Sequence, residues 1–495
     1  GRLDSSRLHH LVLDDAVRTL LEWMNDPDTV QASLEGARWQ ALNASCKSVY
    51  GFSPEKDGSL TAASKLGSRT GEWSAVWQRF AENPIRYPNI PELLDQARPS
   101  VVPLFGDTDP HPDSWPSWNR DQEEVLRIAL SGLAADPDPK RRIVELVAAH
   151  SAREDNVWAV LGQAPLAGAV GHLAELAGRV VAASTATDLK TQVAWYGDEG
   201  HAIDDLALRA LASAKTAQDR AAVATALSAL YDPWVDESAR AFQKAAVTSY
   251  PGQIGLDIDT GTAVVYVDAL RFDLASRVTR RLSPLVVSVE TRLAAFPSVT
   301  PTGQPAVAPI AIAVGGGTAF DAADDQGRSL KGAVLRSALM SAGVQFLEWD
   351  AAKVGDPTGK AWTQTNSIDS LGHSHGHALA DLVDQQLDLV TDGEQALLAA
   401  RVAGGEPAVG EFDLVVAAEG GDDGAGGVQR TQTRGLEAEE GIDLCRADEV
   451  VLGQAADGVR RVADGALAPA DGEVGVVVLA VRDPGGGVHE GHDLV

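Results

Sequence analysis

Three short stretches of the chain carry side chains whose types and spacing suit metal-assisted chemistry. In the first, "TAVVYVDALRFDLA" (262–275), an apolar run ends on Asp268, and Arg271 and Asp273 follow. A carboxylate at the end of a buried strand suits a divalent cation. An Asp at this place can equally cap the next helix. The residues alone leave both interpretations open.

The second stretch is "PSVTPTGQPA" (297–306), in which Pro297 and Pro301 constrain the backbone around Thr300. A Thr hydroxyl at the start of a helix can be a nucleophile if a metal lowers its pKa and backbone N–H groups receive a phosphate. The alternative is a Pro/Thr turn without chemistry.

The third stretch is "WTQTNSIDSLGHSHGHALA" (362–380), where Asp369 and His373 are four residues apart. Oxygen and imidazole ligands of this kind suit zinc or manganese. His375 and His377 add two more imidazoles nearby. A solvent-facing histidine cluster is the alternative.

The elements that would position these residues alternate between strand and helix from about residue 262. We expect strands at 263–268, 285–290 and 344–349 and helices at 272–282, 329–341 and 377–400. This alternation is typical of an α/β fold in which helices cover a parallel sheet. Ligands of such sheets bind at the carboxyl ends of the strands. We therefore expect Asp268, Thr300, Asp369 and His373 to converge in one crevice.

The preceding residues predict a long all-helical region without a metal site. In "DDAVRTLLEWMNDP" the apolar residues recur at helical spacing, Asp14 or Asp15 can cap the start, and Pro27 follows the end. Four parts are expected: a helical region at 1–118 that ends in a Pro-rich linker at 103–118, a second helical region at 119–250, a core at 251–401 and a tail at 402–495.

Bulk composition is that of an ordinary globular protein, with 495 residues, 44% apolar and 22% charged. No apolar run is long enough to span a membrane, and we interpret the chain as an internal fragment of a longer cytoplasmic protein. The net charge of −29 argues against nucleic-acid binding by the whole surface. The two cysteines provide no disulfide framework and no zinc knuckle.

The tail from about residue 402 differs from the rest, because it lacks Lys, Trp and Tyr and is rich in Gly, Ala, Val and acids. The credible strand there is 412–418, with a second apolar run at 474–481. Off-frame GC-rich DNA would encode such a mixture, and a genuine Gly-rich tail that packs poorly is the alternative.

In order and spacing, the three stretches together resemble the PglZ domain of bacterial BREX phage-defence systems, a branch of the alkaline-phosphatase superfamily. Upstream pieces resemble the type B variants of this family. These pieces are "LLEWMNDPD" (20–28), "FSPEKDGSL" (52–60), "VWQRFAENPIRYPNIPELL" (76–94) and "VWAVLGQAPLAGAVGHLAELA" (157–177). The resemblance covers residues 10 to 400 and implies an alkaline-phosphatase-like parallel-sheet core.

The resemblance also implies roles for the matched residues. Asp268 would bind the metal beside the nucleophile, and Thr300 would be that nucleophile and a ligand, with Thr302 a weaker match. Asp369 and His373 would bind a second divalent metal, zinc or alternatively manganese. Such a pair of metals clamps a phosphoryl group and stabilises the leaving oxygen. The implied partners are other BREX proteins, and the implied substrate is a phosphate ester or a nucleic-acid phosphodiester.

The chain departs from the family pattern near its carboxyl end. A strand ending in T-D-H-G should supply an Asp and a His, and a final His should follow. "LVTDGEQ" (389–395) offers Asp392 inside an apparent helix, and "LVVAAEGGDD" (414–423) offers Glu419. His489 and His492 lack the family surroundings. The core is therefore expected to be incomplete, and three of the usual ligands are missing.

Three functional hypotheses follow. The first is a metal-dependent phosphatase or phosphodiesterase of the PglZ type. The second is a non-catalytic scaffold subunit, or an inactive fragment, of the same defence complex. The third is a phosphoglycerate mutase or sulfatase of the same superfamily, against which the long helical region and the "VDALRFD" wording count.

Overall fold

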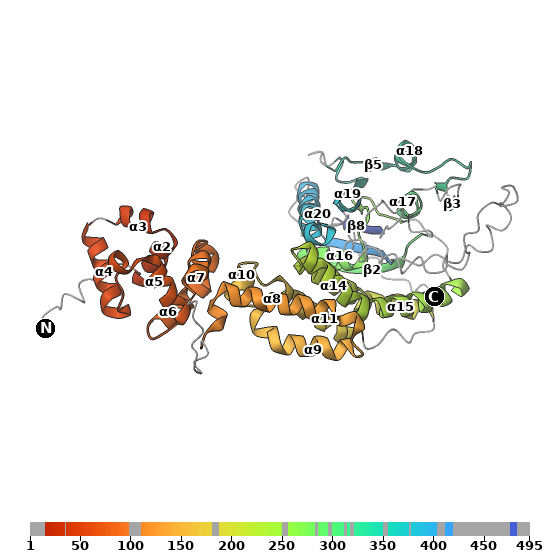
Figure 1. The fold of residues 1–495 in the computed structure, drawn as a ribbon. Helices are drawn as coiled ribbons and strands as arrows, with labels where there is room; N and C mark the ends of the chain where they lie inside the picture. The colour runs from red at the N-terminus through yellow and green to blue at the C-terminus, as the bar shows by residue number, and fades with distance from the viewer. Residues whose placement is uncertain are drawn as a thin grey trace, which may run out of the picture. The chain divides into compact units, whose positions relative to one another are not determined.

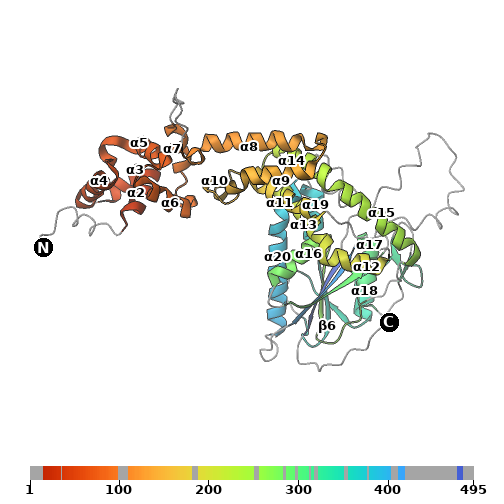
Figure 2. The same ribbon diagram turned by 90° about the horizontal axis from the view of Figure 1, so that it is seen from below.

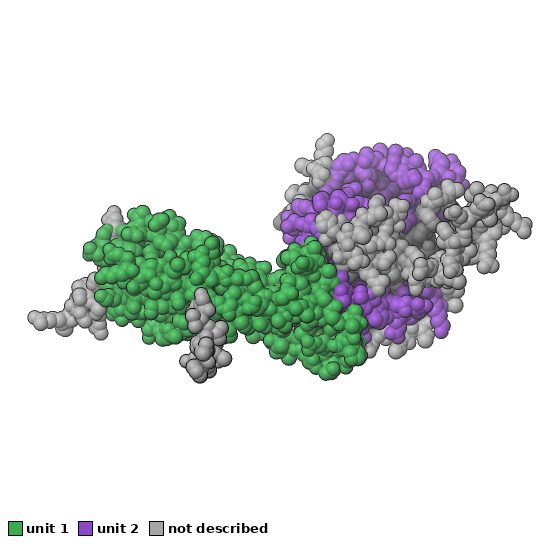
Figure 3. Space-filling model, in the orientation of Figure 1, with its two compact units in different colours: residues 1–171, 213–222 green, residues 172–212, 223–495 purple. Residues whose placement is uncertain are grey.

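The chain is described by a computed structural model, which covers the greater part of the sequence. The described residues are 15–34, 36–98, 110–180, 188–249, 256–282, 286–295, 299–310, 314–316, 321–349, 355–375, 378–402, 411–418 and 476–482. Two compact units are distinguished, residues 1–171 with 213–222, and residues 172–212 with 223–495 (Figure 3). The predicted four-part division is finer and stays a prediction.

The described residues between 15 and 249 contain helices and no strand, which confirms the predicted all-helical region (Figure 1). The α-helices are α2 (Ala16–Asn25), α3 (Pro27–Ser33), α4 (Gly36–Tyr50), α5 (Pro54–Ser68), α6 (Trp73–Glu82), α7 (Ile90–Ala97), α8 (Pro116–Ser131), α9 (Pro139–His150), α10 (Val157–Val160), α11 (Pro165–Arg179), α12 (Leu189–Trp195), α13 (His201–Ser213), α14 (Ala217–Leu230) and α15 (Asp232–Ser249).

Helix α2 begins as its sequence predicts. The Asp15 carboxylate accepts a hydrogen bond from the Arg18 amide at 2.9 Å, and the buried face carries Leu20, Leu21 and Met24. Pro27, expected just after the helix, is the first residue of α3, because Pro is compatible with the first helical turn.

The described end of the predicted linker is packed rather than free. Trp115 is 2% exposed. Its indole packs so closely on Gly67 that a Cβ added to Gly67 would lie 2.4 Å from an indole carbon. The carbonyl of Asp113 accepts a hydrogen bond from the Trp158 indole at 2.7 Å. Residues 103–109 of the linker lie outside the described residues.

A buried ion pair joins the helices that follow. Arg153 is 3% exposed and donates to Glu123 at 2.6 Å and to the Asn119 side chain at 2.6 Å. The second carboxylate oxygen of Glu123 accepts the Leu166 amide at 2.7 Å. The two charges are therefore paired in the interior, although Arg153 Nε is buried without a hydrogen-bond partner among the described residues.

Among the described residues a sheet appears only after residue 262, as the sequence predicts. Its strands are β1 (Ala263–Val267), β2 (Val286–Leu293), β5 (Val344–Phe346), β6 (Lys360–Thr365), β7 (Glu411–Ala418) and β8 (Val476–Arg482), and the short strands β3 (Gly315–Gly316) and β4 (Ala322–Ala323) form a separate pair. The helices between them are α16 (Phe272–Leu282), α17 (Thr300–Val307), α18 (Ala333–Ser341), α19 (Ser367–His375) and α20 (Leu379–Val402).

The six-stranded sheet has the order β2-β7-β8-β1-β6-β5 and is mixed, not fully parallel as predicted. Strands β1, β6 and β5 run parallel, and so do β2 and β7. Strand β8 is antiparallel to both β1 and β7. The described residues are mostly helical. Their one larger sheet is small, and three adjacent strands of it, β1, β6 and β5, are parallel.

Several predicted boundaries need correction. The helix expected at 329–341 begins at Ala333, because Gly332 before it has a φ of 53°. The strand expected at 344–349 ends at Phe346, and the one expected at 285–290 runs on to Leu293. Strand β6 was not predicted, because "KAWTQT" has neither an apolar run nor strict alternation.

The two faces of the sheet are covered by different helices. Figure 2 shows α16 and α20 on one side and α17 and α18 on the other. The core on the α18 side gathers Val264 and Tyr266 of β1, Trp362 of β6 and Leu339 of α18. The residues of β1 are all buried, so this strand can present functional groups only at its ends.

The buried ion pair gives the first testable prediction. Replacing Arg153 with Met strands the Glu123 charge in the interior, which costs about 3–5 kcal/mol. Hydrogen exchange at the amides of α8 and α9 should then become markedly faster. Arg141→Met, which breaks an exposed pair with Glu145, is the control and should cost about 0–1 kcal/mol. Unchanged protection in Arg153→Met would show that the pair does not hold these helices.

Candidate functional site

The Thr300 hydroxyl and the Asp268 carboxylate lie in direct contact. Thr300 Oγ1 is 3.1 Å from Asp268 Oδ1 and 3.3 Å from Oδ2. The two residues are separated by 32 positions in sequence. Two of the four residues proposed from sequence are therefore brought together by the fold.

Asp268 is placed by the end of β1. Its amide donates to the Thr365 carbonyl at 2.9 Å, which extends the parallel ladder between β1 and β6 by one residue. The next residue, Ala269, has a φ of 59°. This left-handed conformation costs a non-glycine residue about 1–2 kcal/mol. It turns the chain sharply, and the Ala269 amide donates back to Asp268 Oδ1 at 3.1 Å.

Thr300 is placed by the first turn of α17. It is the first residue of that helix, and Pro301 follows it. The condition that backbone N–H groups at this helix start receive a phosphate stays a prediction, but two of the nearby amides are engaged. Pro301 has no N–H, and the amides of Thr302 and Gly303 both donate to the Val299 carbonyl, at 2.9 and 2.7 Å. Those donors are already engaged within the turn.

Asp369 and His373 lie on α19, which follows the parallel neighbour of β1. His373 Nε2 is 3.3 Å from Asp369 Oδ1, and the side chains are 51% and 28% exposed. Because β6 ends beside Asp268, the first turn of α19 lies at the same edge of the sheet. The negative charge of Asp369 acts on both Asp268 and Tyr266. Asp369 thus lies within electrostatic range of Asp268, while the convergence of all four residues, and their roles, stay predictions.

The electrostatics of Asp268 are unusual for a carboxylate. Asp268 is 8% exposed, and among the described residues it forms no ion pair with Lys, Arg or His. Burial, and secondly the negative charge of Asp369, raises the pKa of Asp268 from 3.8 to about 6. The hydrogen bonds from the Thr300 hydroxyl and the Ala269 amide lower this pKa, but by less. A buried carboxylate next to a second carboxylate is an environment that a cation would stabilise.

The other acid of the first stretch, Asp273, has different surroundings. Asp273 is fully buried and accepts two hydrogen bonds from Arg271, both at 3.0 Å. The charge of Asp204 on α13 also acts on Arg271, and Asp204 accepts the Tyr196 and Tyr231 hydroxyls, each at 2.5 Å. This cluster anchors the loop after Asp268 to helices of the same unit and does not point to a metal.

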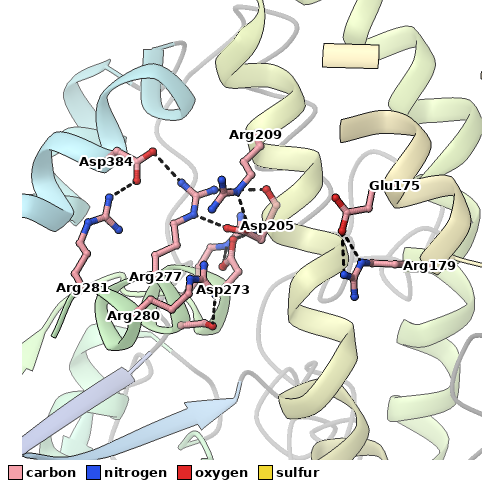
Figure 4. Close-up of polar contacts among 11 residues, drawn as sticks. Glu175, Arg179, Asp205, Arg209, Asp273, Arg277, Arg280, Arg281 and Asp384 are labelled. Atoms are coloured by element: carbon pink, nitrogen blue, oxygen red, sulfur yellow. Dashed lines mark hydrogen bonds and ion pairs between the residues drawn. The ribbon is translucent and has the colours of Figure 1, made fainter. Parts of the chain in front are cut away.

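Helix α16 is fixed by a second group of ion pairs (Figure 4). Arg277, 3% exposed, contacts Asp205 of α13 and, at 3.2 Å, Asp384 of α20. Arg281 reaches the same Asp384 at 2.6 Å. The helix that follows Asp268 is therefore fastened to α13 and α20.

The remaining sequence candidates lie away from this contact or outside the described residues. The His375 ring is 2.8 Å from the hydroxyl of its exposed neighbour Ser374. Asp392 lies inside α20, which confirms that "LVTDGEQ" is helical. The residues that fall outside the described part of the chain are Pro297, His377, Glu419, His489 and His492.

The donors fit a divalent cation in type but are few in number. Carboxylate, hydroxyl and imidazole groups are the ligands that zinc or manganese accepts. Within the described residues, however, no three His, Cys, Asp or Glu side chains form a group that could hold a metal ion.

Sequence analysis overlooked three side chains beside these residues. Tyr266 lies two positions before Asp268 on the same strand face, and its hydroxyl is 3.4 Å from Asp268 Oδ1. Gln304, one helical turn after Thr300, donates to Gln364 of β6 at 2.6 Å. The period of two in a strand and the spacing of four in a helix were signals that could have identified Tyr266 and Gln304.

Comparisons with protein-family models, with curated proteins and with solved structures each gave no match. In the part of the chain that the structure describes, no helix is both long and apolar enough to cross a membrane.

The raised pKa of Asp268 predicts a pH effect in the metal-free protein. A carboxyl whose folded pKa exceeds its unfolded value stabilises the fold at low pH, and this stabilisation is lost as the pH rises through about 6. The rise of the Asp268 pKa from 3.8 to about 6 corresponds to a loss of about 3 kcal/mol in the free energy of unfolding at high pH. Asp268→Asn should therefore unfold at a higher denaturant concentration than wild type at pH 7.5, with the gap closing towards pH 4.

The control for this measurement is Asp236→Asn, which changes an exposed carboxylate paired with Arg240. Its difference from wild type should stay small across the same pH range. A constant difference between Asp268→Asn and wild type from pH 4 to 7.5 would contradict the raised pKa.

Proposed function

We propose that this chain is a metal-dependent phosphatase- or phosphodiesterase-like component of a BREX phage-defence system. In this proposal the sheet and its helices form an alkaline-phosphatase-like core of the PglZ type that is incomplete at its carboxyl end. The observation that carries the proposal is the contact of Thr300 Oγ1 with Asp268 Oδ1 at 3.1 Å. It unites two motifs that were matched separately in the sequence.

The residues suggest how the chain would perform this chemistry. Thr300 Oγ1 would attack the phosphorus atom, and its proton would pass along the existing hydrogen bond to an oxygen of Asp268. The bond from phosphorus to the leaving oxygen would break, and water would later release the phosphoryl group from Thr300. A bound divalent metal would supply positive charge for the phosphoryl oxygens and lower the pKa of the Thr300 hydroxyl.

Asp268 and Thr300 would hold the metal beside the nucleophile, and Asp369 with His373 the other. Zinc is the first choice and manganese the alternative. A catalytic zinc site commonly has three protein ligands, so a pair that supplies only two ligand residues would bind the metal weakly. We therefore expect slow turnover. The partners would be other BREX proteins in the cytoplasm, and the substrate a phosphate ester or a nucleic-acid phosphodiester.

The second candidate function is a non-catalytic scaffold subunit, or an inactive fragment, of the same complex. It is favoured by one observation, the absence of a three-ligand group among the described residues. Under this alternative, the contact between Thr300 and Asp268 would only fasten α17 to the sheet.

The two functions are separated by an activity assay of the whole chain with a bis-aryl phosphodiester and an aryl phosphate, in zinc or manganese. The proposed enzyme should show slow, metal-dependent hydrolysis that falls at least about 1,000-fold in Thr300→Ala, because removing a nucleophile disables the whole catalytic unit. Thr302→Ala is the matched control, since it removes the same group two residues later, and it should retain most of the activity.

Each other outcome has a defined meaning. Turnover that survives Thr300→Ala but not Thr302→Ala would transfer the nucleophile role to Thr302. If a folded wild-type chain neither hydrolyses the substrates nor retains a metal, the scaffold function is correct and the enzymatic proposal is wrong.

A further inference from the structure

The side-chain amide of Gln364 on β6 is held in one orientation. Its Oε1 accepts hydrogen bonds from the Trp362 indole at 3.3 Å and from Gln304 Nε2 at 2.6 Å. Because an indole N–H can only donate, the amide atom of Gln364 that faces Trp362 must be the oxygen. Gln304 must then present its nitrogen to the same oxygen. The nitrogen of Gln364 is therefore left to point away from both partners.

The partners that hold this amide are themselves fixed, whereas Gln364 is open to solvent. Trp362 is fully buried, and its ring stacks on that of Tyr266 with centroids 5.7 Å apart. Gln304 is 9% exposed and lies on α17. Gln364 is exposed, and among the described residues its Nε2 has no hydrogen-bond partner. Its two N–H groups thus form a pre-oriented pair of donors that faces outward.

This pair of donors lies beside the contact between Thr300 and Asp268. Gln304 comes one helical turn after Thr300, so α17 meets the sheet at two places, with Thr300 on Asp268 of β1 and Gln304 on Gln364 of β6. In the ladder Gln364 is opposite Tyr266, two residues before Asp268 and on the same face. A strand spacing of about 4.8 Å and a rise of about 3.3 Å per residue put the Cα atoms of Gln364 and Asp268 about 8 Å apart.

A phosphoryl group at Thr300 needs donors for its oxygens. The start of α17 supplies few of them, because Pro301 has no N–H and the amides of Thr302 and Gly303 donate to the Val299 carbonyl. Donors that are already oriented towards the oxygens of a transferring phosphoryl group stabilise it most. The outward amide of Gln364 is a donor of this kind.

From this arrangement we propose that Gln364 is a substrate-binding residue, whose outward N–H groups donate to a non-bridging oxygen of the phosphoryl group that Thr300 attacks. Gln304 and Trp362 are the positioning residues that set the orientation of its amide. The inference rests on the proposed function, from which it takes the phosphoryl ligand. It adds a substrate contact on β6, in a stretch of the sequence to which the family pattern gave no such role.

The test measures binding of phenylphosphonate, a phosphoryl compound that resists hydrolysis, to the whole chain by titration calorimetry in manganese. The kcat and KM for the bis-aryl phosphodiester are measured beside it. Gln364→Met keeps the length of the side chain and removes its donors without adding charge. Gln364→Glu keeps an oxygen towards Trp362 and Gln304 but replaces the outward N–H groups with a second oxygen. We expect both variants to bind phenylphosphonate at least about 10-fold more weakly and to raise KM, because a hydrogen bond to a charged group is lost.

Two control variants separate substrate binding from a structural effect. Gln304→Met breaks the bridge between α17 and β6 but leaves the donors of Gln364 in place, so its loss of affinity should be smaller than that of Gln364→Met. Gln326→Met makes the same substitution at an exposed glutamine between β4 and α18, and it should bind phenylphosphonate as wild type does.

The outcomes distinguish this inference from the proposed function. Phenylphosphonate affinity of Gln364→Met within twofold of wild type would overturn the inference, and so would an equal loss in Gln304→Met, which would indicate a structural bridge only. Binding that depends on Gln364 in a chain without hydrolytic activity would support the inference and reject the enzymatic proposal. A folded wild-type chain that neither binds phenylphosphonate nor hydrolyses the diester would reject both.

Discussion

The carboxylate of Asp268 is the group on which the rest of the site depends. It is buried at the end of β1 without an ion-pair partner among the described residues, and burying a charge in this way is costly. Two conditions relieve the cost. In the first the group is protonated, as its raised pKa indicates, and in the second a cation lies beside it. The hydrogen bonds from Ala269 and Thr300 offset only part of this cost.

The elements around Asp268 are arranged to keep it in place. The parallel ladder with β6 fixes its backbone, and α17 brings Thr300 to the carboxylate. Behind the loop, Arg271 pairs with the fully buried Asp273, and Arg277 fastens α16 to α13 and α20. Buried pairs of this kind contribute little net stability but fix orientation strongly. A precise loop is what metal-assisted chemistry requires, because small displacements of ligands are costly.

Much of this arrangement could be predicted from the sequence, and the failures have physical causes. Helix α16 has the predicted bounds, because the amphipathic stretch after Asp268 has the spacing of a helix and not that of a strand. Strand β6 was missed because "KAWTQT" owes its strand form to pairing with β1, a contact between residues about 100 positions apart. The position of β8 between β7 and β1, and its antiparallel direction, could not be predicted from the local sequence either, because contacts across the whole sheet determine them.

For the site, the sequence identified the residues that meet but not the atoms that hold them. The proximity of Asp268 and Thr300 followed from motif order and from the rule that ligands bind at strand ends. The left-handed Ala269 could not be foreseen, because nothing in an alanine favours that conformation. The hydrogen bonds from the Thr302 and Gly303 amides to the Val299 carbonyl were equally out of reach, because they depend on the turn that forms around Pro301.

The central proposal is that Asp268 and Thr300 hold one divalent metal and that Asp369 and His373 hold a second. X-ray absorption at the zinc edge of the zinc-loaded chain tests it most directly. The account predicts a first shell of oxygen and nitrogen atoms at about 2.0–2.2 Å, which is altered in Asp268→Asn and in Asp369→Asn. A shell with sulfur at about 2.3 Å, or a spectrum identical in both variants, would place the zinc elsewhere and contradict the account.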